Sequence, residues 1–435
     1  MEGPEYEKEM EVNWSQTSWL PAACFVRPQN ALQVAAILKL VTNLESRFAV
    51  RSGGHNANAG FSSVGEMGML IDLQDIDTLK MEVVPDNILT TGSGNRWISI
   101  YEYLDTRYGL AAVGGRHGGV GVAGFLLGGG MSFFPNMYGL GADSVENFEC
   151  VLANSTFVNA NATNHSDLFR ALKGGGPNFA IVTEFSIRAH DLRDIWYSLD
   201  IFEASDYKAV LNATVQAQLE METDPRMGMF VNVHPGAILV GRFYAKWISR
   251  PKGFAAFDTL KPAATHTPAT NGTLLALISA LETEEIPARR EPRVVSLAVS
   301  LDLYVAIHEE YLALLNTSAA SSTNFSYTIQ PMSVSGIRAG EVRGGNTLGI
   351  QPVPQTYDTA AHDLTQSFGT GIEKLAQARN DHYRYQFMND ASYAQSPLRS
   401  YGPANWANMQ AVSSAYDPAG IFQRLQYAGF LLSRS

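Results

Sequence analysis

The sequence predicts an α+β protein of two domains, each with its own sheet and helices. Three observations support this class. The chain of 435 residues is too long for one ordinary hydrophobic core. Short apolar runs, helical patterns and glycine turns alternate from about residue 23 to 189, and longer alternating strands follow after about residue 195. The content of 46% hydrophobic and 17% charged residues is typical of a compact globular protein.

The first domain is expected to span residues 1–192. Apolar residues recur at helical spacing in 31–43, which predicts a helix, and RFAV at 47–50 predicts the strand after it. Further strands are expected at 68–73 and 88–94, the latter ending in turn glycines. A second helix is expected at 97–109, so this domain combines short strands, helices and many tight turns.

The second domain is expected to span residues 193–395. Long alternating stretches at 228–245 and 293–305 predict strands of an antiparallel sheet. The stretch HEEYLALLN at 308–316 predicts a helix on one face of that sheet. Residues 396–435 are expected to return to the first domain, with a helix that ends at the turn containing Asp417, Pro418 and Gly420.

Charge and composition exclude some classes of partner. A formal net charge of −11 argues against nucleic acid, because phosphate binding needs clustered cations. No run reaches the roughly 20 apolar residues of a membrane span, and no metal site is predicted. Eight Asn-x-Ser/Thr sequons favour a secreted glycoprotein whose signal peptide is outside this numbering; an intracellular enzyme is the alternative. They begin at Asn13, Asn154, Asn161, Asn164, Asn212, Asn271, Asn316 and Asn324.

Four glycine clusters fall in the first domain, at 51–56, 92–95, 113–130 and 173–183. Glycines cost backbone entropy on folding, so this many of them indicate a structural need or a ligand. A phosphate or flat ring can approach backbone N–H groups closely where no Cβ intervenes. A dinucleotide is the predicted ligand. The GxGxxG fingerprint after an early strand is absent, so we expect a fold other than the Rossmann fold.

Several motifs occur in a recognisable order: RSGGHN, GNRW, GGR followed by GVGVAGFLLGGGMSFF, DLFRALKGGGPNFAIVTEF, RGGNTLGI, and YGPAN followed by YDPAGIFQ. Together they resemble FAD-linked oxidases of the vanillyl-alcohol oxidase type, specifically the fungal berberine-bridge-enzyme-like group. The resemblance covers nearly the whole chain. It implies that the first domain is a two-part FAD-binding domain of the PCMH type. The second domain is then a substrate domain with an antiparallel sheet backed by helices.

The resemblance also implies how FAD is held. In this family the RSGGH loop cradles the FAD pyrophosphate, and its histidine is bonded to the flavin 8α-methyl group; the match is His55, which by itself could be an ordinary turn histidine. Relatives often add a second bond through a cysteine, whose position here is His117, so a single covalent bond is expected. The other expected FAD-binding residues are Arg51, Ser52, Gly53, Gly54, Asn56, Gly114, Gly115, Gly118, Gly121, Val122, Gly124, Val182 and Asn405.

The implied chemistry is hydride transfer from a substrate C–H to flavin N5, followed by reoxidation by dioxygen to give hydrogen peroxide. Relatives often use a tyrosine after an asparagine as the base, whereas here Asp390 follows that asparagine. The catalytic candidates are therefore Asp390, Tyr385 and Tyr393, with His117 as a proton-transfer group. Each has a structural alternative: a turn or cap aspartate, packing tyrosines, and a surface or packing histidine.

The predicted function is an oxidase of a small organic molecule, most plausibly a fungal secondary metabolite, with the substrate and dioxygen as partners. A redox-neutral cyclase, Diels–Alderase or isomerase on the same scaffold is the first alternative. A carbohydrate oxidase is the second, although the six tryptophans are scattered rather than grouped as a sugar platform. The oligomeric state is left open.

Overall fold

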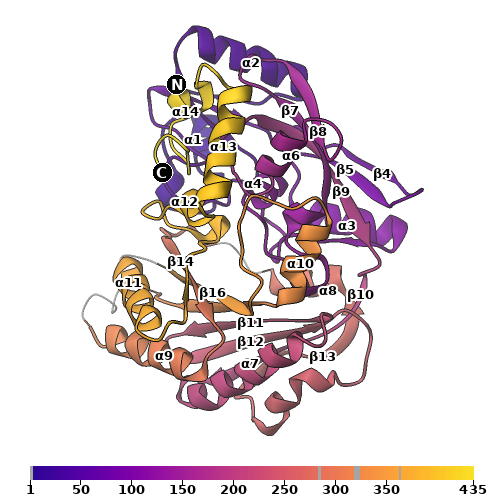
Figure 1. The fold of residues 1–435 in the computed structure, drawn as a ribbon, viewed down its shortest axis with the longest axis vertical. Coiled ribbons are helices and arrows are strands. Elements are labelled where there is room, and N and C mark those ends of the chain that lie inside the picture. The colour runs from indigo at the N-terminus through magenta and orange to yellow at the C-terminus, as the bar shows by residue number, and fades with distance from the viewer. Residues whose placement is uncertain (1–2, 283–285, 318–323, 362–363) are drawn as a thin grey trace.

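The computed structural model describes residues 3–282, 286–317, 324–361 and 364–435. Its strands form three sheets. Two of them lie in the upper half of Figure 1, and the third, of eight strands, lies below them. Among the described residues, no helix combines the length and the apolar character that a membrane crossing requires.

The smallest sheet is parallel, with the order β1 (Cys24–Val26), β3 (Gly68–Asp72) and β2 (Arg47–Arg51). It shares a core with α2 (Ala31–Asn43), whose buried residues Val34, Leu38 and Val41 recur at helical spacing. Asn30 begins this helix by accepting the N–H of Gln33 at 3.0 Å. The RSGGH loop therefore starts at the carboxyl end of a buried strand.

The second sheet contains six strands. Its main order is β4 (Leu79–Glu82), β5 (Ile88–Gly92), β9 (Ile181–His190), β7 (Val145–Val151) and β8 (Phe157–Asn161), with β6 (Ala111–Ala112) paired to β9. The associated helices are α3 (Trp97–Tyr108), α4 (Val122–Leu127), α5 (Pro135–Tyr138) and α6 (Ser166–Leu172). Gly109 ends α3 with a φ of 64°, a left-handed conformation that glycine adopts without a Cβ penalty. The predicted end of this helix is confirmed.

The eight-stranded sheet forms the second half of the molecule. Its order is β13 (Ala264–Thr273), β10 (Asp194–Glu203), β12 (Ala237–Tyr244), β11 (Met227–His234), β15 (Tyr327–Met332), β16 (Gln355–Ala361), β14 (Pro292–Ala298) and β17 (His382–Tyr383). Every pairing is antiparallel, as predicted. Helices α7 (Tyr207–Met221) and α9 (Leu301–Leu315) lie on the side away from the first two sheets (Figure 1), and α11 (Leu364–Gln377) shares their core against the large sheet. The opposite face is therefore directed toward those sheets.

One predicted strand was partly wrong. The stretch 293–305 is strand only to Ala298, because α9 starts at Leu301. Ser300 caps that helix by accepting the N–H of Leu303 at 3.4 Å. A run of apolar residues fits both a buried strand and a buried helix, so the cap decided where the strand ended.

The C-terminal segment packs on the first domain. It contains α12 (Pro397–Ser400), α13 (Pro403–Tyr416) and α14 (Ile421–Leu425). The Asp417 carboxylate ends the turn between α13 and α14 by accepting the N–H groups of Ile421 and Phe422 at 2.7 and 2.8 Å. Phe422 lies edge-on to Phe48 at 6.4 Å, which joins this segment to the smallest sheet. The remaining helices are α1 (Pro4–Met10), α8 (Leu274–Leu281) and α10 (Val334–Val342).

Candidate functional site

A cavity of about 630 Å³ lies between the first domain and the eight-stranded sheet. One side is lined by the RSGGH loop, by residues from 115 to 128, and by parts of β9 and the C-terminal segment. The other side includes Phe230 of β11 and Thr328 and Gln330 of β15. A cavity of this size and mostly apolar lining is typical of a cofactor or small-molecule site.

The structure brings most of the predicted site residues to this cavity. Those on the lining are Ser52, Gly53, Gly54, His55, Asn56, Gly115, His117, Gly121, Gly124, Val182 and Asp390. Those outside the lining are Arg51, Gly114, Gly118, Val122, Asn405, Tyr385 and Tyr393. The residues on the lining come from separate parts of the chain, and the fold has placed them around one space.

Glycines leave parts of the cofactor side of the cavity bare, between bulky side chains such as Phe125 and Leu127. A Cβ added to Gly53 would lie 2.4 Å from the backbone nitrogen of Gly121, so the two loops pack backbone against backbone. A Cβ added to Gly124 would meet no atom within 4 Å, because this residue faces open space. The bare wall suits a ligand that needs close approach to backbone N–H groups, and the residues present therefore fit a bound dinucleotide.

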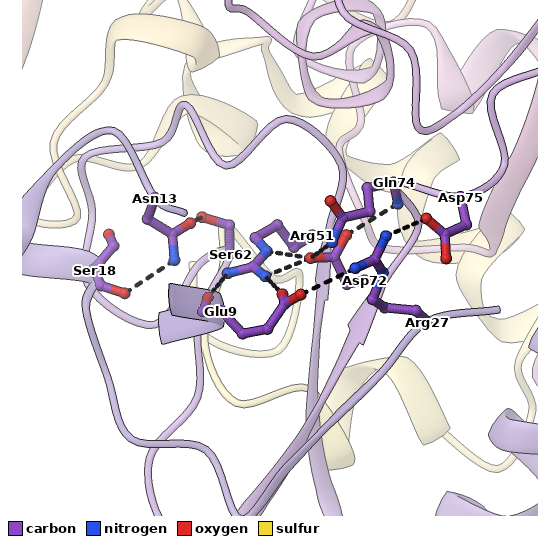
Figure 2. Close-up of polar contacts among 9 residues, drawn as sticks. All are labelled: Glu9, Asn13, Ser18, Arg27, Arg51, Ser62, Asp72, Gln74 and Asp75. Carbon is purple, nitrogen blue, oxygen red and sulfur yellow. Dashed lines mark hydrogen bonds and ion pairs between the residues drawn. The ribbon is translucent and has the colours of Figure 1, made fainter. Parts of the chain in front are cut away.

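Arg51 has a different place from the one predicted, because it is fully buried behind the loop (Figure 2). Its Nε donates to Asp72 Oδ2 at 2.6 Å, and its remaining nitrogens donate to the Glu9 carbonyl and carboxylate at 2.7 and 2.8 Å. Burial raises the pKa of Asp72, and the positive charge of Arg51 opposes that rise. Arg51 therefore anchors the end of β2 to the N-terminal helix and does not line the cavity.

The N-terminal segment covers the RSGGH loop, which the sequence did not suggest. The N–H of Trp14 donates to the Gly54 carbonyl at 3.0 Å, and Asn13 is hydrogen-bonded to Ser62 at 3.0 Å (Figure 2). The Trp14 indole stacks on the His55 imidazole, with ring centres 4.4 Å apart and planes 14° from parallel. The Arg290 guanidinium lies 4.1 Å from the centre of the Trp14 ring. The imidazole of His55 is thus oriented by an aromatic neighbour.

Three predicted cofactor residues instead serve packing. A Cβ on Gly114 would lie 2.2 Å from the Trp97 ring, and one on Gly118 would meet the Glu282 carboxylate at 2.0 Å. Val122 is fully buried at the start of α4. These positions keep neighbouring elements close together, which explains why glycine and a small apolar residue occur there without facing the cavity.

The predicted site residues Asn405, Tyr385 and Tyr393, near the C-terminus, all lie outside the cavity lining. Asn405, near the start of α13, donates to the carbonyl of Tyr401, the residue that follows α12, at 3.1 Å. Tyr385 is buried and stacks on Tyr401, with ring centres 5.7 Å apart. Tyr393 is 64% exposed. Neither tyrosine lines the cavity, so the structure does not support the expectation that they reach the substrate.

Asp390 is the one predicted base at the cavity. Its carboxylate Oδ2 accepts a hydrogen bond from Gln330 Nε2 at 2.9 Å. The preceding residue, Asn389, accepts the N–H of Gly130 and donates to the Gly124 carbonyl, each at 3.0 Å. The asparagine therefore fixes the short helical turn that carries Asp390, and the aspartate side chain faces the eight-stranded sheet.

Two further polar groups face the same space. His117 accepts the N–H of Gly119 on Nδ1 at 3.1 Å, so a neutral ring carries its proton on Nε2. Arg116 donates to Gln330 Oε1 and lies 5.9 Å from the centre of the Phe230 ring. Sequence reasoning missed Arg116, although it directly precedes His117 in the glycine-rich motif. It also missed Gln330 and Phe230, for which the alternating strand pattern offers no functional signal.

Comparisons with known proteins agree with this geometry. A family model described as an FAD binding domain matches residues 22–161. The FAD-dependent monooxygenase macF of Penicillium terrestre is 34% identical, over 99% of this chain and 85% of that protein. The bifunctional solanapyrone synthase of Alternaria solani is 30% identical, over 94% and 81%. The chain belongs to the family of FAD-linked oxidoreductases that includes these two fungal proteins.

The solved structure of Physcomitrella patens BBE-like 1 superposes on this FAD-linked oxidoreductase with a TM-score of 0.79, covering 98% of this chain and 96% of that one at 17% identity. The predicted α+β fold, the family and the assignment as an FAD-linked enzyme are confirmed. FAD is the cofactor that the family match supports. The residues fitted to hold it are the 52–56 loop, Gly121, Gly124 and Val182. Within the described parts of the chain, no group of three or more His, Cys, Asp or Glu side chains is arranged to hold a metal ion.

Proposed function

We propose that this FAD-linked oxidoreductase is an oxidase of a small, largely apolar organic molecule, of the kind made in fungal secondary metabolism. The observation that carries the proposal is the cavity itself, in which a glycine-bare wall faces the polar group of Asp390, Gln330 and Arg116. When bound, FAD would supply the oxidising chemistry, as a hydride acceptor that dioxygen can reoxidise with formation of hydrogen peroxide. The names of the fungal relatives support an oxidative reaction.

Asp390 is proposed as the base that takes the proton from a substrate O–H. The hydrogen bond from Gln330 orients the carboxylate, and the Asn389 contacts fix its backbone, so the proton acceptor is held on a rigid support. The substrate lies against Phe230 in this arrangement. Asp390→Asn should lower kcat by about 10²- to 10⁴-fold while the variant still binds FAD. Unchanged turnover in that variant would remove Asp390 from the mechanism.

His55 is proposed to carry FAD covalently, with no second covalent bond at His117. Support comes from the small residues around His55, its place on the cavity lining and its stacking on Trp14. Denatured protein should show a mass increase equal to FAD less the two hydrogens lost when the C–N bond forms. His55→Ala should abolish that increase, and His117→Ala should leave it intact. An unaltered polypeptide mass in the unsubstituted protein would refute the attachment.

A redox-neutral cyclase or isomerase is the second candidate, supported by similarity to a relative named as a bifunctional synthase. Anaerobic addition of substrate separates the two. The oxidase should lose its yellow absorption without oxygen and form peroxide with oxygen, whereas a redox-neutral enzyme turns over with neither signal. Relatives named monooxygenases add a third outcome, oxygen from labelled dioxygen in the product, which would replace the oxidase assignment.

We also propose that the protein is secreted and glycosylated at its exposed sequons. The exposed sequon asparagines are Asn154, Asn164, Asn212, Asn271, Asn316 and Asn324. Asn13 is excluded as a site in the folded protein, because it is 3% exposed and its side chain is hydrogen-bonded to Ser18 and Ser62. Enzymatic deglycosylation of protein from the native source should reduce its mass. No mass change would contradict the proposal.

A further inference from the structure

Arg116 is a half-buried cation on the lining of the cavity. Among the described side chains it makes one hydrogen bond, to Gln330, and no ion pair. The guanidinium has five N–H donors and keeps its charge at any ordinary pH. A charge that is partly withdrawn from water is unfavourable unless an opposite charge or several hydrogen bonds compensate for it. The unmet requirement points to an anion from outside the chain.

The Asp390 carboxylate is held apart from Arg116 by Gln330. One end of this amide accepts from Arg116, and the other end donates to Asp390 at 2.9 Å. Burial lowers the pKa of Arg116, and Asp390 raises it through space, so the two charges influence each other without touching. The Gln330 amide therefore lies between the Arg116 guanidinium and the Asp390 carboxylate on the lining of the cavity.

The surroundings of Arg116 fit a flat ligand. The Phe230 ring lies 5.9 Å from its guanidinium, and both residues line the cavity. A planar aromatic or conjugated group could pack on this ring while its oxygen meets the guanidinium, which binds planar oxyanions well. The positive group comes from the first domain and the apolar group from β11, so both halves of the molecule contribute to the subsite.

We propose that Arg116 forms an oxyanion subsite for the substrate, which carries a phenolic or enolic hydroxyl or a carboxylate on a planar group. In the hydroxyl case, the O–H bond breaks, its proton goes to the Asp390 carboxylate, and the electron pair stays on the oxygen facing Arg116. A carboxylate arrives already ionised and donates no proton. The inference rests on the proposed function for the position of the substrate, but binding at Arg116 requires no oxidation.

Three probes of similar size test the subsite by calorimetric titration of the purified holoprotein near neutral pH: benzoate, 4-nitrophenol and benzamide. Benzoate should bind at least about 10-fold tighter than its neutral isostere benzamide. The 4-nitrophenol arm separates the two sources of oxyanion, because its phenolate is recognised by a distinct visible absorption band. Bound probe should contain more phenolate than free probe at the same pH. Tighter binding of benzoate would indicate a carboxylate substrate, and tighter binding of 4-nitrophenolate would indicate a phenolic or enolic one.

Arg116→Gln should abolish the preference for benzoate while benzamide still binds, which verifies that the cavity is intact. Arg116→Lys, which retains the charge, should keep benzoate binding within about 10-fold of the unsubstituted protein. Arg379→Gln is the matched control, since Arg379 is exposed beyond the end of α11. Equal binding of benzoate and benzamide, no detectable binding of either anion, or an unchanged preference in Arg116→Gln would overturn the subsite.

The test also separates failure of the subsite from failure of the oxidase proposal. Anion binding that depends on Arg116 in a protein that forms no peroxide with any substrate would retain the subsite and reject the oxidase. Peroxide formation from a phenolic or carboxylate substrate at equal rates in the unsubstituted protein and Arg116→Gln, together with equal binding of benzoate and benzamide, would reject the subsite and retain the oxidase. Calorimetry measures the first property, and a peroxide assay measures the second.

Discussion

Replacing Asp72 by Asn should strongly destabilise the first domain. Arg51 and Asp72 side chains are both 0% exposed, and they form an ion pair between β2 and β3. The substitution leaves a buried guanidinium whose remaining anionic partner is Glu9, on the N-terminal helix (Figure 2). Loss of one member of a buried pair typically costs about 3–5 kcal/mol. Because Glu9 still compensates part of the charge, we expect about 3 kcal/mol.

That free energy corresponds to a fall in melting temperature of roughly 6–12 °C for a domain of this size. Thermal unfolding followed by circular dichroism measures it, and urea unfolding gives the free energy independently. Glu9→Gln is the matched control, because the Glu9 side chain is 21% exposed. It should cost about 1 kcal/mol or less, as expected for a partly solvated pair.

A second comparison tests whether the cost arises from the unpaired charge. The double variant Arg51→Leu with Asp72→Leu removes both charges and should be more stable than Asp72→Asn alone. The reasoning is wrong if Asp72→Asn unfolds within about 0.5 kcal/mol of the unsubstituted protein, or if Glu9→Gln costs as much as Asp72→Asn. Either result would mean that the buried pair does not anchor the loop that follows β2.

Three other predictions follow from the site and the core. Trp14→Ala should slow covalent FAD attachment to His55, measured as the mass-shifted fraction of protein over time, while Trp14→Phe should retain most of it because a stacked ring remains. Gly124→Ala should fold normally yet retain less FAD, by absorbance of the purified protein, whereas Gly53→Ala should destabilise the fold because its Cβ meets backbone. Burial lowers the pKa of His308 to about 4 from 6.5, so the unfolded chain binds more protons between these values. Unfolding free energy should therefore fall by up to about 3 kcal/mol on acidification from pH 6.5 to 4, and His308→Gln should flatten that slope.

Local patterns predicted the elements whose character depends on near neighbours. The helix at 31–43 and the strand starting at 47 occur where the periodicity indicated them, because apolar spacing and capping residues act within a few positions. The run at 293–305 was harder to assign, because its apolar residues fit a buried strand and a buried helix equally well. The strand ends at Ala298 and the helix begins at Leu301, after its capping residue Ser300. Alternation in the second half also predicted the antiparallel pairing, although not the order of the strands.

The motif resemblance predicted the cofactor correctly, but it was less successful at predicting which residues line the cavity. Gly53, Gly121 and Gly124 reach the cavity as expected, whereas Gly114 and Gly118 pack against other side chains. All five are glycines in similar motifs, and only the tertiary packing separates those that line the cavity from those that lie outside it. Tyr393 is a comparable case, because its chain position near Asp390 did not bring it into the cavity.

The sequence by itself determined the fold class, the FAD-linked family and the glycine-rich loop around His55, because these depend on periodicity and on motifs of neighbouring residues. Tertiary structure alone decided that Arg51 pairs with Asp72 behind that loop and that Trp14 stacks on His55. It also decided that Arg116 and Gln330, 214 positions apart, meet at one cavity. Charge pairing, stacking and burial depend on distance in space, and distance along the chain does not reveal them.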